Sequence, residues 1–242
     1  MNSPLNKRQK NTLKLSALGA GLIASLTACP RPVPPPSYSN VNLTFTFPAI
    51  SRADAQNLML AAYYYDGSET LKLLQQNPLS YGGYSGSSET ITSAQLPLYN
   101  LDSALQNSKC SSPFVGGETK DRTQVSVTPN TVNTCNVYFS IYTDGGQHFP
   151  TSTTEKYMTN DLVSFASSNF TYSFVSPDGN STESGSRKQG WTLIRHQVLQ
   201  PSSTPGKYLV SMNSVPAAEQ ALPIRMHEPT NGLISQSIRG KK

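Results

Sequence analysis

Residues 40–47 read NVNLTFTF, and this stretch decides the fold class. Apolar and polar residues alternate along it, which places Val41, Leu43, Phe45 and Phe47 on one face of an extended chain. A helix would need a period near 3.6, and the stretch does not show one. We therefore expect a β-strand with one face against a core.

The same alternation returns further along the chain. It is present at residues 136–142, which end at Asp144-Gly145-Gly146, and again at residues 170–174. Residues 191–200 and 207–212 flank the turn-rich PSSTPG and indicate an antiparallel hairpin. Several short strands separated by turn signals are typical of an all-β protein.

Two other parts of the chain are less clear. Residues 57–65 (NLMLAAYYY) are apolar on both faces and favour a buried strand, although Ser51 followed by ADAQ is also able to cap a helix. Short helices are expected near residues 100–107 and 152–161. The polar runs YGGYSGSSET, STESGSRKQG and TPNTVNT are interpreted as loops or edge decorations.

We therefore expect an antiparallel β-sandwich, immunoglobulin-like or transthyretin-like, with long polar loops and one or two short helices. The folded domain is expected over residues 41–232, as one β-sandwich or two small β domains, and residues 233–242 form a basic C-terminal tail. No repeated unit of fixed period is present.

Charge is sparse and unevenly placed. Charged residues make up 14% of the chain, against about 25% in an average soluble domain. Four of the basic residues lie before Cys29 and no acidic residue does, so 15 basic and 14 acidic residues remain from Cys29 onward. This balance argues against nucleic acid as a partner, because the basic character belongs to a targeting segment.

The first 28 residues have the organisation of a secretory leader. Lys7, Arg8, Lys10 and Lys14 precede residues 15–28, which are apolar or small. A helix of that length reaches about 21 Å, short of the roughly 30 Å hydrocarbon layer. The segment is therefore interpreted as a signal peptide rather than a membrane span.

Leu26-Thr27-Ala28-Cys29 closes this leader and resembles the lipobox of bacterial lipoproteins. The resemblance covers only the first 29 residues. It implies a diacylglycerol thioether on Cys29, cleavage after Ala28 and acylation, typically with palmitate, of the new amino terminus. Pro30 stands where the family's inner-membrane retention signal would have Asp, which favours the outer membrane. The alternative is an ordinary secretory leader with a coincidental cysteine.

Residues 29–40 are interpreted as a tether between lipid and domain. Five prolines lie in residues 30–36, and each fixes φ, so the segment favours polyproline II. At about 3.1 Å per residue, eleven residues span about 34 Å. A proline-rich ligand for a partner domain is the alternative.

With Cys29 assigned to lipid, Cys110 and Cys135 remain. An even pair in an oxidising compartment is most simply a disulfide, which we predict here. The alternative of a redox or metal pair is disfavoured, because 25 positions separate the two residues, unlike the CxxC of redox enzymes.

Catalytic and metal motifs are absent from the sequence. His148, His196 and His227 lack the H-x₃₋₅-H spacing of zinc sites, although distant histidines can converge in a fold. His227-Glu228 resembles the start of HExxH, but Asn231 takes the place of the second histidine. We therefore predict no cofactor and no metal.

Serine and carboxylate chemistry is equally unsupported. Gly83-Tyr84-Ser85-Gly86 lacks the last glycine of G-x-S-x-G, since Ser87 follows, and no Ser-x-x-Lys occurs. Asp66, Asp144 and Asp178 each precede a glycine and are interpreted as turn residues rather than calcium ligands or acid–base groups. We predict that the protein is not an enzyme.

Aromatic residues give the candidate binding site. Tyr81 and Tyr84 lie beside glycines in a loop-like run and are able to form a stacking platform for a sugar or an interface for a protein. Tyr63–Tyr65 and the lone Trp191 are interpreted mainly as core residues.

These observations predict a lipid-anchored cell-envelope protein with a structural or accessory role, which binds another envelope protein or a surface glycan. A glycan or small-ligand module using the tyrosine-rich loops is the alternative, and an unrecognised hydrolase or metalloenzyme is a third hypothesis.

Overall fold

Strand β1 (Asn40–Ser51) confirms the prediction from residues 40–47, with Leu43, Phe45 and Phe47 all buried. The structure, a computed structural model, describes residues 40–81, 89–146, 148–201, 207–216 and 219–229. The leader, the lipobox, the tether and the C-terminal tail lie outside these residues. The described residues belong to one compact unit, residues 34–242.

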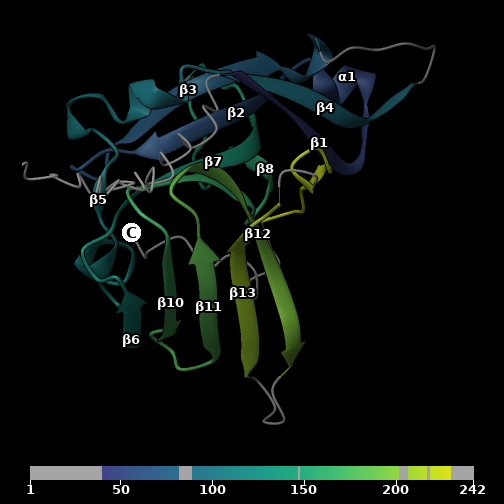
Figure 1. The fold of residues 1–242 in the computed structure, drawn as a ribbon. Helices are drawn as coiled ribbons and strands as arrows, with labels where there is room; N and C mark the ends of the chain where they lie inside the picture. The colour runs from purple at the N-terminus through teal and green to yellow at the C-terminus, as the bar shows by residue number, and fades with distance from the viewer. Residues whose placement is uncertain (1–39, 82–88, 147, 202–206, 217–218, 230–242) are drawn as a thin grey trace, which may run out of the picture. The chain divides into compact units, whose positions relative to one another are not determined.

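The described strands form two sheets (Figure 1). In the smaller, β1 lies between β14 (Ile224–Arg225) and β4 (Thr90–Tyr99). The larger follows the order β3-β2-β7-β9-β12-β13-β11-β10-β6, and β5 and β8 pair with β7 off this path. Its strands are β2 (Leu58–Tyr65), β3 (Leu71–Pro78), β5 (Ser112–Pro113), β6 (Thr123–Thr128), β7 (Asn133–Thr143), β8 (Glu155–Met158), β9 (Leu162–Ala166), β10 (Phe170–Val175), β11 (Ser181–Arg187), β12 (Gly190–Pro201) and β13 (Tyr208–Ser214).

The larger sheet has an apolar core on each of its faces. On one face it packs against the small sheet, where the rings of Phe45 and Phe139 lie 5.1 Å apart between centroids. On the other face a second core gathers residues from β9, β10, β12 and β13. Neighbouring residues alternate between the two cores: Leu193 belongs to the first and Ile194 to the second. Central strands buried on both faces follow from this arrangement.

The expected β-sandwich is therefore confirmed. The hairpin across PSSTPG is also confirmed, because β12 and β13 pair antiparallel. Two pairs are parallel, β1 with β14 and β11 with β13, and they interrupt the antiparallel pattern. Alternation of side chains gives no information on strand direction, so the sequence did not reveal these two pairs.

Residues 51–65 contain both elements that the sequence offered as alternatives, a capped helix and a buried strand. Ser51 caps the short helix α1 (Arg52–Ala55), and its hydroxyl accepts a hydrogen bond from the backbone N–H of Asp54. Strand β2 then follows, and both of its faces are buried, as predicted for residues 57–65.

Residues 100–107 form short 3₁₀ turns, η2 (Leu101–Ala104) and η3 (Gln106–Ser108). The helix expected near 152–161 is wrong. Strand β8 occupies part of that range, because Tyr157 and Met158 are buried beside β7. Within the described ranges, no helix combines the length and apolar composition needed to cross a bilayer.

The interpretation of STESGSRKQG as a loop is also wrong. Residues 181–187 form β11, an interior strand between β10 and β13. Its inward face carries Glu183, Gly185 and Arg187, which are not apolar, so the usual period-two signal is missing. Of the other polar runs, TPNTVNT joins β6 to β7 as predicted, while most of YGGYSGSSET lies outside the described residues.

Cys110 and Cys135 form the predicted disulfide, with Cα atoms 5.1 Å apart. Both residues are buried in the first core. The bond joins the start of β7 to the segment that follows η3, and so links a loop to a central strand of the larger sheet.

Candidate functional site

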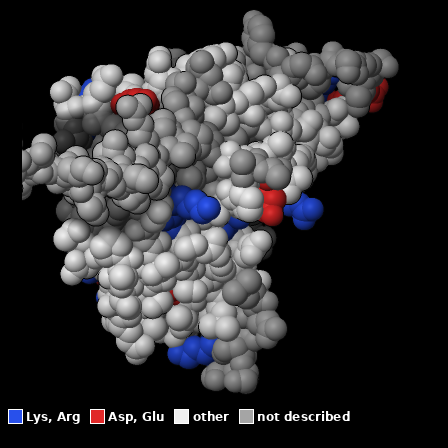
Figure 2. All heavy atoms as spheres, in the orientation of Figure 1, with Lys and Arg blue, Asp and Glu red and all other residues white. Residues whose placement is uncertain are grey.

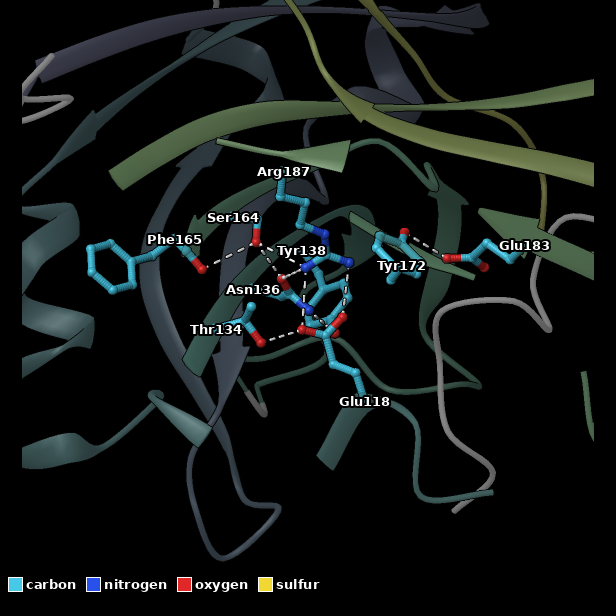
Figure 3. Close-up of polar contacts among 9 residues, drawn as sticks. All are labelled: Glu118, Thr134, Asn136, Tyr138, Ser164, Phe165, Tyr172, Glu183 and Arg187. Carbon is cyan, nitrogen blue, oxygen red and sulfur yellow. Dashed lines mark hydrogen bonds and ion pairs between the residues drawn. The ribbon is translucent and has the colours of Figure 1, made fainter. Parts of the chain in front are cut away.

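The most distinctive cluster of polar side chains surrounds Arg187, near the end of β11 (Figure 3). Asn136 on β7 and Ser164 on β9 are cross-strand neighbours, and both reach Arg187. Glu118 ends the irregular turn η4 (Phe114–Glu118), which follows β5. The cluster therefore joins three strands of one sheet to a turn that precedes all three in the chain.

Arg187 and Glu118 make a two-point ion pair. Nη2 of Arg187 lies 2.9 Å from Oε2 of Glu118, and Nη1 lies 3.2 Å from Oε1. The Arg187 side chain is 3% exposed to solvent, and the Glu118 side chain is 22% exposed. Thr134 also donates a hydrogen bond to Glu118. The planar guanidinium matches both carboxylate oxygens, which an ammonium group could not do.

Two further hydrogen bonds hold the guanidinium on its sheet side. Nη1 of Arg187 donates to Oδ1 of Asn136 at 3.2 Å and to Oγ of Ser164 at 3.1 Å. The Ser164 hydroxyl in turn donates to the same Asn136 oxygen at 2.8 Å. These neutral acceptors stabilise a buried cation that would otherwise be costly to remove from water.

Three aromatic rings complete the surroundings of Arg187. Its Cζ atom lies 5.2 Å from the Phe114 ring centroid, 5.4 Å from that of Tyr172 and 5.8 Å from that of Phe170. These distances are within the range of cation–π attraction, which strengthens when the cation is desolvated. Burial opposes the charged form of Arg187, but Glu118 and Tyr172 outweigh it and raise the pKa.

Glu183 lies on the same face of β11, four residues before Arg187. It is 3% exposed, and the Tyr172 hydroxyl donates to its Oε1 at 2.9 Å. Its Oε2 has no hydrogen-bond partner among the described residues. Burial raises the pKa of Glu183 to about 7, although the bond from Tyr172 and the charge of Arg187 act in the opposite direction. The pKa of Tyr172 is also well above its usual value, first because of burial.

Gly185 separates these two charged residues on β11. A Cβ atom there would collide with the carbonyl oxygen of Met212 and would come within 2.9 Å of the Tyr172 ring. Tyr172 is the cross-strand partner of Gly185, so its ring covers the position that a side chain would occupy. The missing side chain is what allows the ring to lie between Glu183 and Arg187.

This cluster has the chemistry of a structural network. Arg187 is committed to Glu118, and the Ser164 hydroxyl bonds to an amide oxygen rather than to a base that could activate it. The network therefore fixes η4, β7, β9 and β11 relative to each other. Glu183 is the group in it whose protonation changes near neutral pH.

The three histidines do not gather at one site. The exposed His148 ring lies 3.5 Å from the carboxylate of Asp144, in the turn after β7. His196 and His227 interact electrostatically, and burial lowers the pKa of His196. Across the described residues, no group of three or more His, Cys, Asp or Glu side chains is arranged to hold a metal ion.

A second polar cluster ties the C-terminal segment to the sheet. Asp161 accepts hydrogen bonds from the backbone N–H of His196 at 2.9 Å and from Nη1 of Arg195 at 2.6 Å. Arg195 also donates to the carbonyls of Leu222 and Pro223, just before β14. The contacts of Arg195 therefore attach the segment before β14 to β12, and they indicate a structural role.

The remaining predicted residues have structural positions. The three aspartates that precede glycine are turn residues, since each accepts a backbone N–H within four positions of itself. Trp191 is 4% exposed, and its indole N–H donates to Asp102 at 2.9 Å. Tyr81 ends the short turn η1 (Leu79–Tyr81), but its side chain and all of Tyr84 lie outside what is described.

Comparison with family models, curated proteins and solved structures gives no match for this chain. The Arg187 network was not predicted from sequence, because its members lie in five separate segments. The available signal was weak: an Arg and a Glu at alternate positions of a polar run, with a glycine between them.

Proposed function

We propose that this chain is a lipid-anchored protein of the bacterial cell envelope with a structural or accessory, partner-binding role and no catalysis. The observation that carries the proposal is the Cys110–Cys135 disulfide. A buried disulfide suits an exported protein. It also accounts for two of the three cysteines and leaves Cys29, at the end of an apolar leader, for lipid.

The tether and the surface agree with this role. Two or three acyl chains, at about 0.8 kcal/mol per buried CH₂, would anchor the chain stably, and residues 30–40 would hold the β domain away from the bilayer. Among the described residues visible in Figure 2, few side chains are charged. A surface of this kind favours a protein or neutral partner over nucleic acid. Pro30 after the cysteine favours the outer membrane as the location.

Lipidation is tested by expressing the full chain in a diderm bacterium with an alkyne analogue of palmitate. We expect label on the wild-type protein and none on Cys29→Ser, which should also leave the membrane fraction. The matched control is the double variant Cys110→Ser/Cys135→Ser, which keeps Cys29 and should keep the label. An unlabelled wild-type chain would overturn the anchor.

The partner-binding role has its own test. The chain is extracted in several mild detergents and captured with a C-terminal tag, with Cys29→Ser as the control that does not reach the membrane. We expect an envelope protein to be enriched with the wild type only. Recovery of the chain alone in every detergent would contradict an accessory role.

A further inference from the structure

Strand β6 (Thr123–Thr128) ends the larger sheet on the side of the second core, and no described segment pairs with its outer edge. At the opposite end of the larger sheet, β3 lies beside β4 of the small sheet. On the far side of the small sheet, the segment after β14 bonds to both β1 and β8, through Met226 and His227. Within the described ranges β6 pairs with β10 alone, and Figure 1 shows it at the outer side of that strand.

The composition of β6 leaves its edge open. It reads TQVSVT, with no charged residue and no proline to block pairing, and the side chains of Thr123–Ser126 are exposed. Natural edge strands are usually protected by such residues. The positive φ of Gln124 (51°) bends the start of the strand, so the straight edge runs over Val125–Thr128.

The face of β6 that looks toward the second core is incompletely covered. Val127 packs against that core, but Val125, two positions before it on the same face, is 38% exposed. The row of apolar side chains that runs across β10 and β6 therefore ends in an exposed valine. One more strand beside β6 would cover it.

The edge is complementary to itself. In an antiparallel pair of two copies centred on Ser126, Val125 of one copy lies opposite Val127 of the other, on the apolar face. Ser126 then lies opposite Ser126 on the polar face. Directly opposite residues of an antiparallel pair share one face, so this register joins valine to valine and brings no like charges together.

We propose that β6 is a homotypic docking edge, at which two copies of this chain pair antiparallel about Ser126 and continue the larger sheet across a two-fold axis. Two-fold interfaces of this kind use the same surface patch on both subunits. The proposal goes beyond the lipid anchor and does not depend on it.

The pairing is short. It buries much less than the roughly 1,600 Å² of a standard interface, so we expect a weak association that cross-linking captures. If the chains are confined to a membrane, their effective concentration rises and pairing is favoured.

Site-specific cross-linking tests the proposal on the full chain in detergent. Residues opposite each other on the two-fold axis have Cβ atoms about 5 Å apart, within reach of a disulfide. We therefore expect Ser126→Cys to give a dimer band under mild oxidation that disappears with reductant. Thr171→Cys is the matched control, because it is an exposed position one strand further from the axis and should stay monomeric.

A second experiment tests the pairing register by combining a thiol reporter elsewhere on β6 with the charge-introducing substitution Ser126→Lys. In this register Val125 and its symmetry mate lie two positions apart along the paired strands, within about 9 Å, so a thiol reporter at Val125→Cys with a short bismaleimide should cross-link to a second copy. Adding Ser126→Lys should reduce that yield at least tenfold by placing two cations face to face. Thr171→Lys is the control and should leave the yield unchanged.

The outcomes are separable. If the Ser126→Cys band is no stronger than the Thr171→Cys band, the pairing is overturned. If cysteine at 126 joins a different protein in cells and never a second copy, the edge binds another partner and the homotypic proposal is wrong. The test is repeated with Cys29→Ser, so that failure of the lipid anchor is distinguished from failure of the edge.

Discussion

Arg187 and Glu118 lie 69 positions apart in the chain, and their side chains meet in a two-point ion pair beside the second core. Arg187 comes from the strand β11, and Glu118 from a turn that precedes β6. The pair links the larger sheet to the turn η4, whose Phe114 ring packs against the rings of Phe170 and Tyr172. Its geometry explains why a polar run can form an interior strand.

Removing one member of this pair should destabilise the fold strongly. Glu118→Gln leaves a buried guanidinium without its counter-charge, and we expect a loss of about 3 kcal/mol in the free energy of unfolding. Arg187→Lys should lose less, because it keeps the charge but not the two-point contact. Urea titration measures both losses. Lys188→Ala, at the exposed neighbouring position, is the control and should change stability by less than about 0.5 kcal/mol.

Stability should fall as the pH rises through neutrality because of Glu183. Its pKa is about 7 in the folded protein and near 4.5 when the chain is unfolded. Between these values the folded state binds the extra proton, so raising the pH favours unfolding, by about 3 kcal/mol in total above pH 7. Below pH 4.5 the effect vanishes, since both states are protonated.

Glu183→Gln should remove this dependence. Urea midpoints measured at pH 5, 6.5 and 8 should decline for the wild type relative to the variant, which should be the more stable of the two at pH 8. The comparison cancels the opposite contribution of His196, whose lowered pKa makes stability rise with pH in both proteins. Glu219→Gln, at an exposed carboxylate, should retain the wild-type slope. Parallel curves for wild type and Glu183→Gln would show that Glu183 is ionised throughout.

Gly185→Ala should be far more harmful than an ordinary glycine substitution. The new methyl group would meet the backbone of Met212 and the ring of Tyr172, which cannot both move aside. We expect a loss of about 3 kcal/mol or failure to fold, as for severe overpacking. Gly145→Ala is the matched control, because nothing lies within 4 Å of its Cβ position. Thermal melts of the two variants should therefore differ clearly, and equal melting temperatures would refute the close packing.

The disulfide should contribute substantially to stability. The bond closes a loop across 25 positions, for which the chain-entropy model gives about 3.5 kcal/mol. Cys110→Ser/Cys135→Ser should lower the urea midpoint accordingly, and reductant should have no further effect on that variant. Cys29→Ser should leave the midpoint unchanged. A midpoint equal to that of the wild type would mean that the bond does not constrain the unfolded chain.

The sequence by itself determined the class of fold and the positions of its regular strands. Alternation at residues 40–47 and 170–174 predicts strands directly, because a period of two is what a half-buried strand requires. The disulfide was also predictable, since an exported chain with one cysteine assigned to lipid leaves a single pair. These inferences use local pattern and counting alone.

Only the tertiary structure decided the role of β11 and the Arg187 network. A strand whose inward face reads Glu183, Gly185 and Arg187 is stable in the interior only when other segments supply the opposite charge, the hydrogen-bond acceptors and the aromatic rings. Those groups come from η4, β7, β9 and β10, which pairing across long stretches of chain brings together. The position of β6 at the end of the described sheet was decided in the same way, because whether a strand has one neighbour or two is a property of the whole sheet.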